Sequence, residues 1–297
     1  KDNTAPTIEN ISFFIRKGEV VVLAGQSGCG KSTIFRCING LCPRFFEGEK
    51  KGGIYLNGKE STPLRICDIS RLVASVFQNP ESQFFTTDVL SDLVYACENY
   101  GVPKGEIETR LNRIVSMLSL SPLIGKKLSE LSGGEKQKVA IASTLMLNAD
   151  VLLLDEPSSN LDYQSIALLK AILAELKSKG YTIIVIEHRL YYLADVCDRL
   201  IVFERGKISR IYEGVILKAV SNEELHLQGL RGLHPFQNTV CDLAPKRGSG
   251  PLFILDNLIF GYEKFTNILK GVSFSVYPGD KIALIGRNGC GKTTLGK

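Results

Sequence analysis

Short, continuous apolar runs alternate along the chain with segments whose apolar residues recur at helical spacing. The runs predicted as strands cover residues 20–24, 72–77, 151–154, 183–186 and 200–203. The segments predicted as helices cover residues 31–39, 88–98, 107–118, 132–147 and 163–179. Strands that are apolar throughout must be buried on both faces, so this order predicts an α/β fold with a parallel sheet covered by helices.

One internal repeat runs through the chain at a constant offset. Ile11-Ser-Phe-Phe-Ile-Arg-Lys-Gly-Glu recurs as Val272-Ser-Phe-Ser-Val-Tyr-Pro-Gly-Asp, and a glycine-rich segment at 25–33 recurs at 286–294. So long a period indicates a duplicated domain rather than a solenoid. Residues 208–251 between the copies show little periodicity and many Gly and Pro residues. We therefore expect a first domain over 1–225, a linker over 226–250 and the truncated N-terminal part of a second domain over 251–297.

Composition and charge exclude several classes of protein. The 297 residues are 44% apolar and 23% charged, which is ordinary globular composition and excludes disordered and collagen-like chains. A net charge of +5 is too mild and dispersed to indicate nucleic-acid binding by itself. The apolar stretches fall short of the ~18 residues of a membrane-spanning helix. Eight cysteines without a CxxC pair give no support for a zinc site. The chain opens on Lys1, so we expect its natural N-terminus to lie upstream.

The glycine-rich segment fits the phosphate-loop pattern GxxxxGK[ST], placed between a predicted strand and a predicted helix as that motif requires. Such a loop turns backbone N–H groups onto a phosphate chain, while Lys31 reaches the β- and γ-phosphates and the Ser32 hydroxyl binds Mg²⁺. Thr293 has the place of Ser32 in the second copy. The residues predicted to bind ATP are Gly25, Gln26, Ser27, Gly28, Cys29, Gly30, Lys31, Ser32 and Thr33, and then Gly286, Arg287, Asn288, Gly289, Cys290, Gly291, Lys292, Thr293 and Thr294.

Two acidic residues follow the apolar run 151–154. Asp155 would hold Mg²⁺ directly or through water, and Glu156 would polarise the water that attacks the γ-phosphate. The alternative is a strand whose terminal acids are merely solvated. A phosphate loop upstream favours the catalytic interpretation.

Leu131-Ser132-Gly133-Gly134-Glu135 stands shortly before this acidic pair. Here the chain resembles the ATP-binding-cassette (ABC) ATPases, whose signature is LSGGQ, with Glu135 in place of the usual Gln. Ser132 and Glu135 also form the S-x-x-E pattern of a helix capping box, and both interpretations can hold at once. The resemblance implies a P-loop nucleoside triphosphatase fold with a parallel core sheet, an antiparallel β subdomain and a helical signature subdomain, followed by the start of a second copy.

Further family elements occur in the family's order. The resemblance implies that Gln78 senses Mg²⁺ and a membrane partner, that Asp162 couples two ATP sites, and that His188 contacts the γ-phosphate. In this family ATP lies between the phosphate loop of one domain and the signature of the other. Ser132, Gly133 and Gly134 would then face the nucleotide held by the second loop. Tyr262 stands where the family has an aromatic residue that stacks on adenine, although it could equally be a core strand residue. Its counterpart in the first copy falls at Lys1.

The segment 77–85, Phe-Gln-Asn-Pro-Glu-Ser-Gln-Phe-Phe, resembles that of the energy-coupling-factor (ECF) ATPases. This implies ATP hydrolysis with Mg²⁺ that powers uptake of a vitamin or a transition-metal ion. A groove near Gln78 would seat a helix of a membrane scaffold protein. Phe84 and Phe85 would contact that helix, or would simply pack under the helical subdomain.

Two ATPase copies in one chain resemble the ECF transporters that have two fused ATPase domains. Two copies also occur in cytosolic tandem-cassette translation factors, which act on ribosomes. Those proteins carry a long charged linker, whereas residues 208–251 are short and rich in Gly and Pro, which favours transport. The implied partners are an integral-membrane scaffold subunit, a substrate-binding membrane subunit, and a second ATPase half in the same chain or in a homodimer, with no nucleic acid. The implied location is the cytoplasmic face of the cell membrane, as a peripheral subunit. The transported substrate cannot be read from this chain.

Overall fold

The computed structural model describes residues 7–233, 250–262, 267–286 and 288–296. The chain divides into two compact units, Lys1–Pro235 and Phe236–Lys297. Each unit is described by itself.

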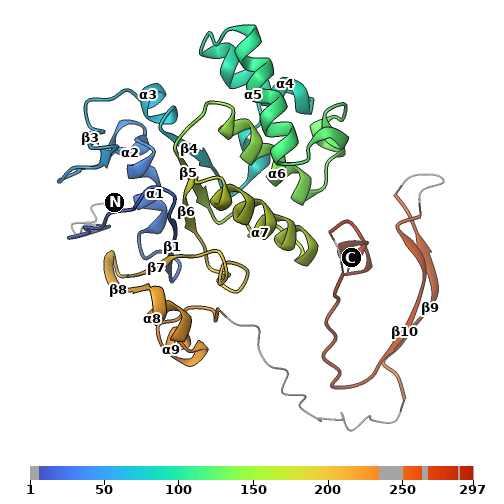
Figure 1. Cartoon of the computed structure of the whole chain (residues 1–297). Coiled ribbons are helices and arrows are strands. Elements are labelled where there is room, and N and C mark those ends of the chain that lie inside the picture. The colour runs from blue at the N-terminus through green and yellow to red at the C-terminus, as the bar shows by residue number, and fades with distance from the viewer. Residues whose placement is uncertain (1–6, 234–249, 263–266, 287, 297) are drawn as a thin grey trace. The chain divides into compact units, whose positions relative to one another are not determined.

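A six-stranded sheet forms the centre of the first unit, in the order β4-β5-β6-β1-β7-β8 (Figure 1). The strands are β1 Val20–Gly25, β4 Val73–Val76, β5 Val151–Asp155, β6 Thr182–Ile186, β7 Arg199–Glu204 and β8 Lys207–Glu213. Strands β4, β5, β6, β1 and β7 pair in parallel, and β8 pairs antiparallel to β7. The carboxyl ends of β4, β5 and β6 therefore meet at one edge, where ligands bind in open α/β sheets.

Helices cover both faces of this sheet. They are α1 Lys31–Ile38, α2 Leu41–Arg44, α3 Ile66–Ser70, α4 Val89–Asn99, α5 Lys104–Met117, α6 Gly133–Leu145, α7 Tyr163–Ser178, α8 Gly214–Ala219 and α9 Asn222–Leu227. Alternate residues of the strands belong to two separate buried clusters, because successive side chains of a strand point to opposite faces. Helix α1 packs into one cluster, and α6 and α7 pack into the other. Helices α4, α5 and α6 gather at one end of the unit (Figure 1).

The predicted strands and helices of this unit are present. Residues 208–225, for which the sequence pattern predicted no strand or helix, contain most of β8, all of α8 and part of α9. The edge strand β8 is mostly exposed and has no continuous apolar run. Helices α8 and α9 are only six residues long, which is too short for a clear helical period in the sequence. The expected antiparallel β subdomain is reduced, among the described residues, to the hairpin β2 Tyr55–Leu56 and β3 Lys59–Glu60. Residues 11–16 alternate between half-buried and exposed side chains as a strand would, without strand pairing.

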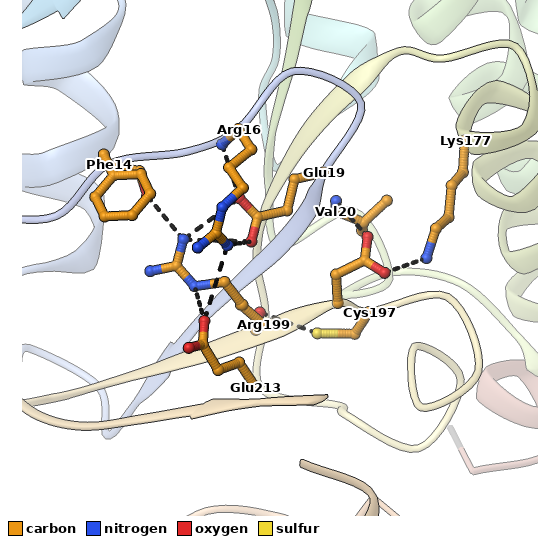
Figure 2. A network of polar contacts seen from close by, with 9 residues as sticks. Phe14, Arg16, Glu19, Val20, Lys177, Cys197, Arg199 and Glu213 are labelled. Atoms are coloured by element: carbon orange, nitrogen blue, oxygen red, sulfur yellow. Dashed lines mark hydrogen bonds and ion pairs between the residues drawn. The ribbon is translucent and has the colours of Figure 1, made fainter. Parts of the chain in front are cut away.

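A buried ionic network lies where β1 and β7 begin, at the edge of the sheet opposite to the carboxyl ends (Figure 2). Arg199 is 5% exposed; its Nη1 donates to the carbonyl of Phe14 at 2.8 Å, and it pairs with Glu19 at 3.3 Å and Glu213 at 3.2 Å. The network ties the segment before β1 and the end of β8 to the start of β7.

The second unit contains β9 Phe253–Phe260, β10 Leu269–Val276 and the short helix α10 Lys292–Gly296. Strands β9 and β10 pair antiparallel, and many of their apolar side chains are exposed. Within the described residues the chain thus has one complete α/β unit, not two fused ATPase domains. None of the helices in the described part of the chain is both long and apolar enough to span a bilayer.

Candidate nucleotide-binding site

The first glycine-rich loop connects β1 to α1 directly. Gly30 is the N-cap of α1 with φ +103°, a conformation that favours glycine. Lys31 is buried, and its Nζ atom donates to the carbonyls of Gly25 at 2.8 Å and Gln26 at 2.9 Å. The ammonium group therefore lies across the loop that precedes the helix. Loop N–H groups, the helix N-terminus and this charge form an arrangement that could bind a phosphate chain.

Asp155 is the last residue of β5 and is partly buried. Its Oδ1 atom has no hydrogen-bond partner among the described residues. Burial and, next, the neighbouring Glu156 together raise the pKa of the Asp155 carboxyl to about 6, against the opposite effect of Arg36 and Lys31. A buried carboxylate oxygen without a partner is a suitable ligand for a hard divalent cation such as Mg²⁺. The donor set at this end of the sheet therefore fits the metal that the sequence predicts.

Glu156 directly follows β5, and the loops after the two neighbouring strands, β4 and β6, lie on either side of it. Its backbone has φ +44°, and its N–H donates to the carbonyl of Ile186 at 2.8 Å. One carboxylate oxygen accepts from Nε2 of Gln78 at 2.8 Å, and the other lies 3.0 Å from Nε2 of His188. The structure thus brings Gln78, Glu156 and His188 together, although the three are spread over more than one hundred positions of sequence.

Ser132 begins α6 with the capping box that the sequence predicts. Its Oγ accepts from the N–H of Glu135 at 3.4 Å, while the Glu135 carboxylate accepts from the N–H and hydroxyl of Ser132, both at 2.8 Å. These hydrogen bonds lower the pKa of Glu135. Gly134 lies against α7, because an added Cβ would stand 2.6 Å from Oγ of Ser165. Asp162 caps α7 by accepting from the N–H of Ser165 at 2.9 Å.

A polar cavity of about 620 Å³ separates the first turn of α6 from the two loops that follow β4 and β5. It is lined by Gln78, Asn79, Pro80, Glu81, Gly133, Lys136, Gln137, Pro157, Asn160 and Leu161. An ion pair between Lys136 and Glu81 joins α6 to the Gln78 loop.

A second cavity, mostly apolar and about 350 Å³ in volume, lies near the Gln78 loop, between β4, α4 and α6. Phe84 is half-buried and packs against the core, whereas Phe85 is 72% exposed and stacks on Tyr95 with ring centroids 5.0 Å apart. Asp92 fixes this loop, since its carboxylate accepts from the N–H of Phe85 at 3.0 Å and from the hydroxyl of Ser143 at 3.1 Å. Of the two aromatic side chains, only Phe85 is available for an external contact.

The second glycine-rich loop shows the same local geometry as the first. Nζ of Lys292 donates to the carbonyl of Gly286 at 2.6 Å, as Lys31 does to Gly25. Tyr262 is exposed, and its ring packs edge-to-face on that of Phe260 with the ring centroids 5.2 Å apart. Arg287 and Lys1 lie outside the described residues. The expected meeting of Ser132, Gly133 and Gly134 with Lys292 and Thr293 stays a prediction.

Glu187 forms a family element together with His188 in the sequence, but the sequence assigned a role only to His188. Its carboxylate is buried and accepts from the N–H groups of both His188 and Arg189. An acidic residue that ends a fully apolar strand was the available signal.

Comparison with known proteins gives a consistent result. The family model described as ABC transporter matches residues 8–159 and 269–297. A putative ABC transporter ATP-binding protein of Treponema denticola is 64% identical over the whole of this chain, and one of Streptococcus agalactiae is 35% identical over 98% of it. The chain spans about three fifths of the length of these curated relatives, 61% and 57% respectively.

Solved structures agree with the family model. The structure of cbiO1 from Clostridium perfringens, described as part of the ABC transporter complex cbiONQ, matches with a TM-score of 0.64 and 30% identity over 69% of this chain and 81% of that one. An ATP-binding cassette of an ABC transporter in its ADP conformation matches with a TM-score of 0.62 and 28% identity, over 72% of this chain and 88% of that one.

Proposed function

The chain belongs to the ABC transporter family of ATP-binding proteins, and on that premise we propose that it binds and hydrolyses ATP to power import through a membrane transporter. The transporter we propose is of the ECF type and carries a vitamin or a transition-metal ion. The observation that carries the ATPase part is the convergence of Gln78, Glu156 and His188 beside the loop that holds Lys31. The Glu156 carboxylate as a base, the Lys31 ammonium as a cation and the loop N–H groups as hydrogen-bond donors to phosphate thus lie at one end of one sheet.

In the proposed reaction, Lys31 and the loop N–H groups bind the β- and γ-phosphates. Asp155, Ser32 and Gln78 would hold Mg²⁺, which when bound would supply positive charge to offset that of the phosphates. Glu156 accepts a proton from the attacking water, and its hydrogen bond from Gln78 orients the carboxylate. His188, on the other side of Glu156, stabilises charge that develops on the γ-phosphate.

We further propose that each complete site needs two cassettes. Residues 251–297 would begin a second ATPase domain whose loop, with Lys292 and Thr293, takes ATP opposite Ser132, Gly133 and Gly134. Tyr262 would stack on adenine, and Asp162 would couple the two sites. The second half belongs to the same polypeptide or, as the alternative, to another copy of it. The repeated loop geometry and the greater length of the relatives support the first arrangement.

The partners we propose are an integral-membrane scaffold subunit and a substrate-binding membrane subunit, with the chain bound at the cytoplasmic face of the cell membrane. Support comes from the likeness to cbiO1 and from the apolar cavity beside the Gln78 loop. The exposed ring of Phe85 at the rim of that cavity would contact a helix of the scaffold.

Replacing Lys31 by Ala tests ATP binding at the first loop. In a protein that also carries Lys292→Ala, we expect Lys31→Ala to weaken MgATP binding about 100-fold or more, which corresponds to about 2.7 kcal/mol. Isothermal titration calorimetry measures this, with Lys104→Ala, an exposed lysine on α5, as the matched control. Unchanged affinity in the double variant would refute the assignment of this loop.

Capture of the membrane partners tests the proposed role in transport. Tagged protein captured from its native membranes should retain a small scaffold-type membrane protein and a substrate-binding membrane subunit, identified by mass spectrometry. Capture of ribosomal subunits without membrane proteins would favour the translation-factor alternative and leave the ATPase proposal standing.

A further inference from the structure

The carboxylate of Glu187 is buried between two loops of the candidate site and accepts four hydrogen bonds. One oxygen accepts from the N–H of His188 at 2.7 Å and of Arg189 at 3.1 Å. The other accepts from the N–H of Ser158 at 3.3 Å and from the hydroxyl of Tyr192 at 2.8 Å. Every partner is a donor, so the site fits an ionised carboxylate, which only accepts.

A second pair of contacts joins the same two loops. Nη1 of Arg189 donates to the carbonyl of Ser158 at 3.2 Å and to that of Leu161 at 3.4 Å. Ser158 and Leu161 lie on the loop between Glu156 and Asp162, while Arg189 lies on the loop after β6. The loop that carries His188 is therefore fastened from both sides to the loop that runs from Glu156 to α7.

This fastening has a direct bearing on His188. Its N–H is held by Glu187, and its imidazole Nε2 lies 3.0 Å from the Glu156 carboxylate. The opposite oxygen of Glu187 is fixed by Ser158 and by Tyr192, whose pKa is raised well above its ordinary value by burial, so that the phenol stays a donor. A shift of either loop would therefore move the imidazole relative to Glu156.

We propose that Glu187 is a positioning residue that sets the distance between His188 and Glu156 and makes the loops 157–161 and 188–192 move as one. The proposal deepens the proposed function, on which its kinetic part rests, because it assigns a residue to the hydrolytic step at the Lys31 site. A carboxylate that only held the fold together would affect stability without a selective effect on turnover.

Glu187→Gln is the most direct variant, because the amide keeps the shape of the side chain but turns an NH₂ group toward one pair of donors. In the intact protein with Lys292→Ala, we expect kcat for ATP hydrolysis to fall about tenfold or more, with KM for ATP within about twofold. Tyr192→Phe is the matched control, since it removes one of the four donors and leaves the other three. We expect it to lower kcat less than Glu187→Gln does.

A readout independent of turnover separates the two proposals. The chain has three histidines, so the imidazole proton signal of His188 can be followed by NMR and assigned by its loss in His188→Gln. Glu187→Gln should shift this signal in protein that remains folded. If the parent protein does not hydrolyse ATP but the signal shifts, the proposed function fails and the positioning role stands. An unmoved signal with unchanged kcat, or a kcat that falls only with the folded fraction, would overturn the role of Glu187.

Discussion

Asp155 lies in the first unit without a hydrogen-bond donor for its Oδ1 atom, and burial raises the pKa of this carboxyl from 3.8 to about 6. A raised pKa means that the folded protein binds the proton more tightly than the unfolded chain. The cost of keeping Asp155 ionised is therefore absent well below pH 4, grows as the pH rises, and is complete above about pH 6. Such a cost is expected where a side chain is held ready for a cation.

Replacing Asp155 by Asn should stabilise the metal-free protein. We expect the free energy of unfolding at pH 7.5 to rise by about 1–2 kcal/mol. This is less than the full pKa shift of Asp155 would give, because the residue is only partly buried and solvent screens part of the effect. The gain should disappear as the pH is lowered to 4. Urea denaturation in the presence of a chelator measures it, with Glu108→Gln, an exposed carboxylate on α5, as the control. A less stable Asn variant at pH 7.5 would show that Asp155 has a stabilising partner.

Contacts between elements determine where the functional loops lie. The first turn of α6 can approach α7 because Gly134 has no Cβ to overlap Ser165, and Asp162 caps α7 at the same place. At the other edge of the sheet, Arg199 joins β7 to β8 and to the segment before β1 (Figure 2). Arg199 and Glu19 are both buried, and each is the only buried charge partner of the other in this network, because Arg16 and Glu213 are exposed.

Replacing Arg199 by Met should be strongly destabilising, because it leaves the buried Glu19 carboxylate with only the exposed Arg16 as a charge partner among the described residues, at 3.6 Å. We expect a loss of about 3 kcal/mol in the free energy of unfolding. Adding Glu19→Gln should recover part of this loss, because the two residues act as a pair. Denaturation of the single and double variants measures both effects.

Arg210 provides the contrasting case in the same strand region. It pairs with Glu224 on the surface, so Arg210→Met should cost less than about 1 kcal/mol. Equal losses for the Arg199 and Arg210 variants would contradict the importance assigned to the buried network.

The elements that sequence could predict are those with a strong local pattern. The five parallel strands were evident because each consists mostly of consecutive apolar residues, and the loop at Lys31 was evident from its glycine spacing. Strand β8 was missed because it is an exposed edge strand, and the role of Glu187 was missed because its hydrogen bond from Ser158 joins two segments that only the fold brings together. The contact of Glu156 with both Gln78 and His188 likewise follows from strand order, which no local pattern contains.

At the scale of the whole molecule, one complete α/β unit carries the loop at Lys31 together with Glu156 and the side chains around it, and the second unit carries a loop of the same type. The first unit buries a core on both faces of its sheet, whereas the described strands of the second leave many apolar side chains exposed. The relatives extend well beyond the length of this chain. We therefore propose that ATP binding and proton transfer take place in the first unit and that residues outside it complete the site.

Glu156→Gln tests this account most directly, in a protein whose second loop is disabled by Lys292→Ala. The amide keeps the size of the side chain but cannot accept a proton from water at neutral pH. We predict that MgATP affinity stays within about twofold while ATP turnover falls by about 100-fold or more, both measured on the same preparation. Glu108→Gln should leave both quantities unchanged. Normal turnover in the Glu156→Gln variant would contradict the assignment of Glu156 as the base and, with it, the mechanism proposed for this protein.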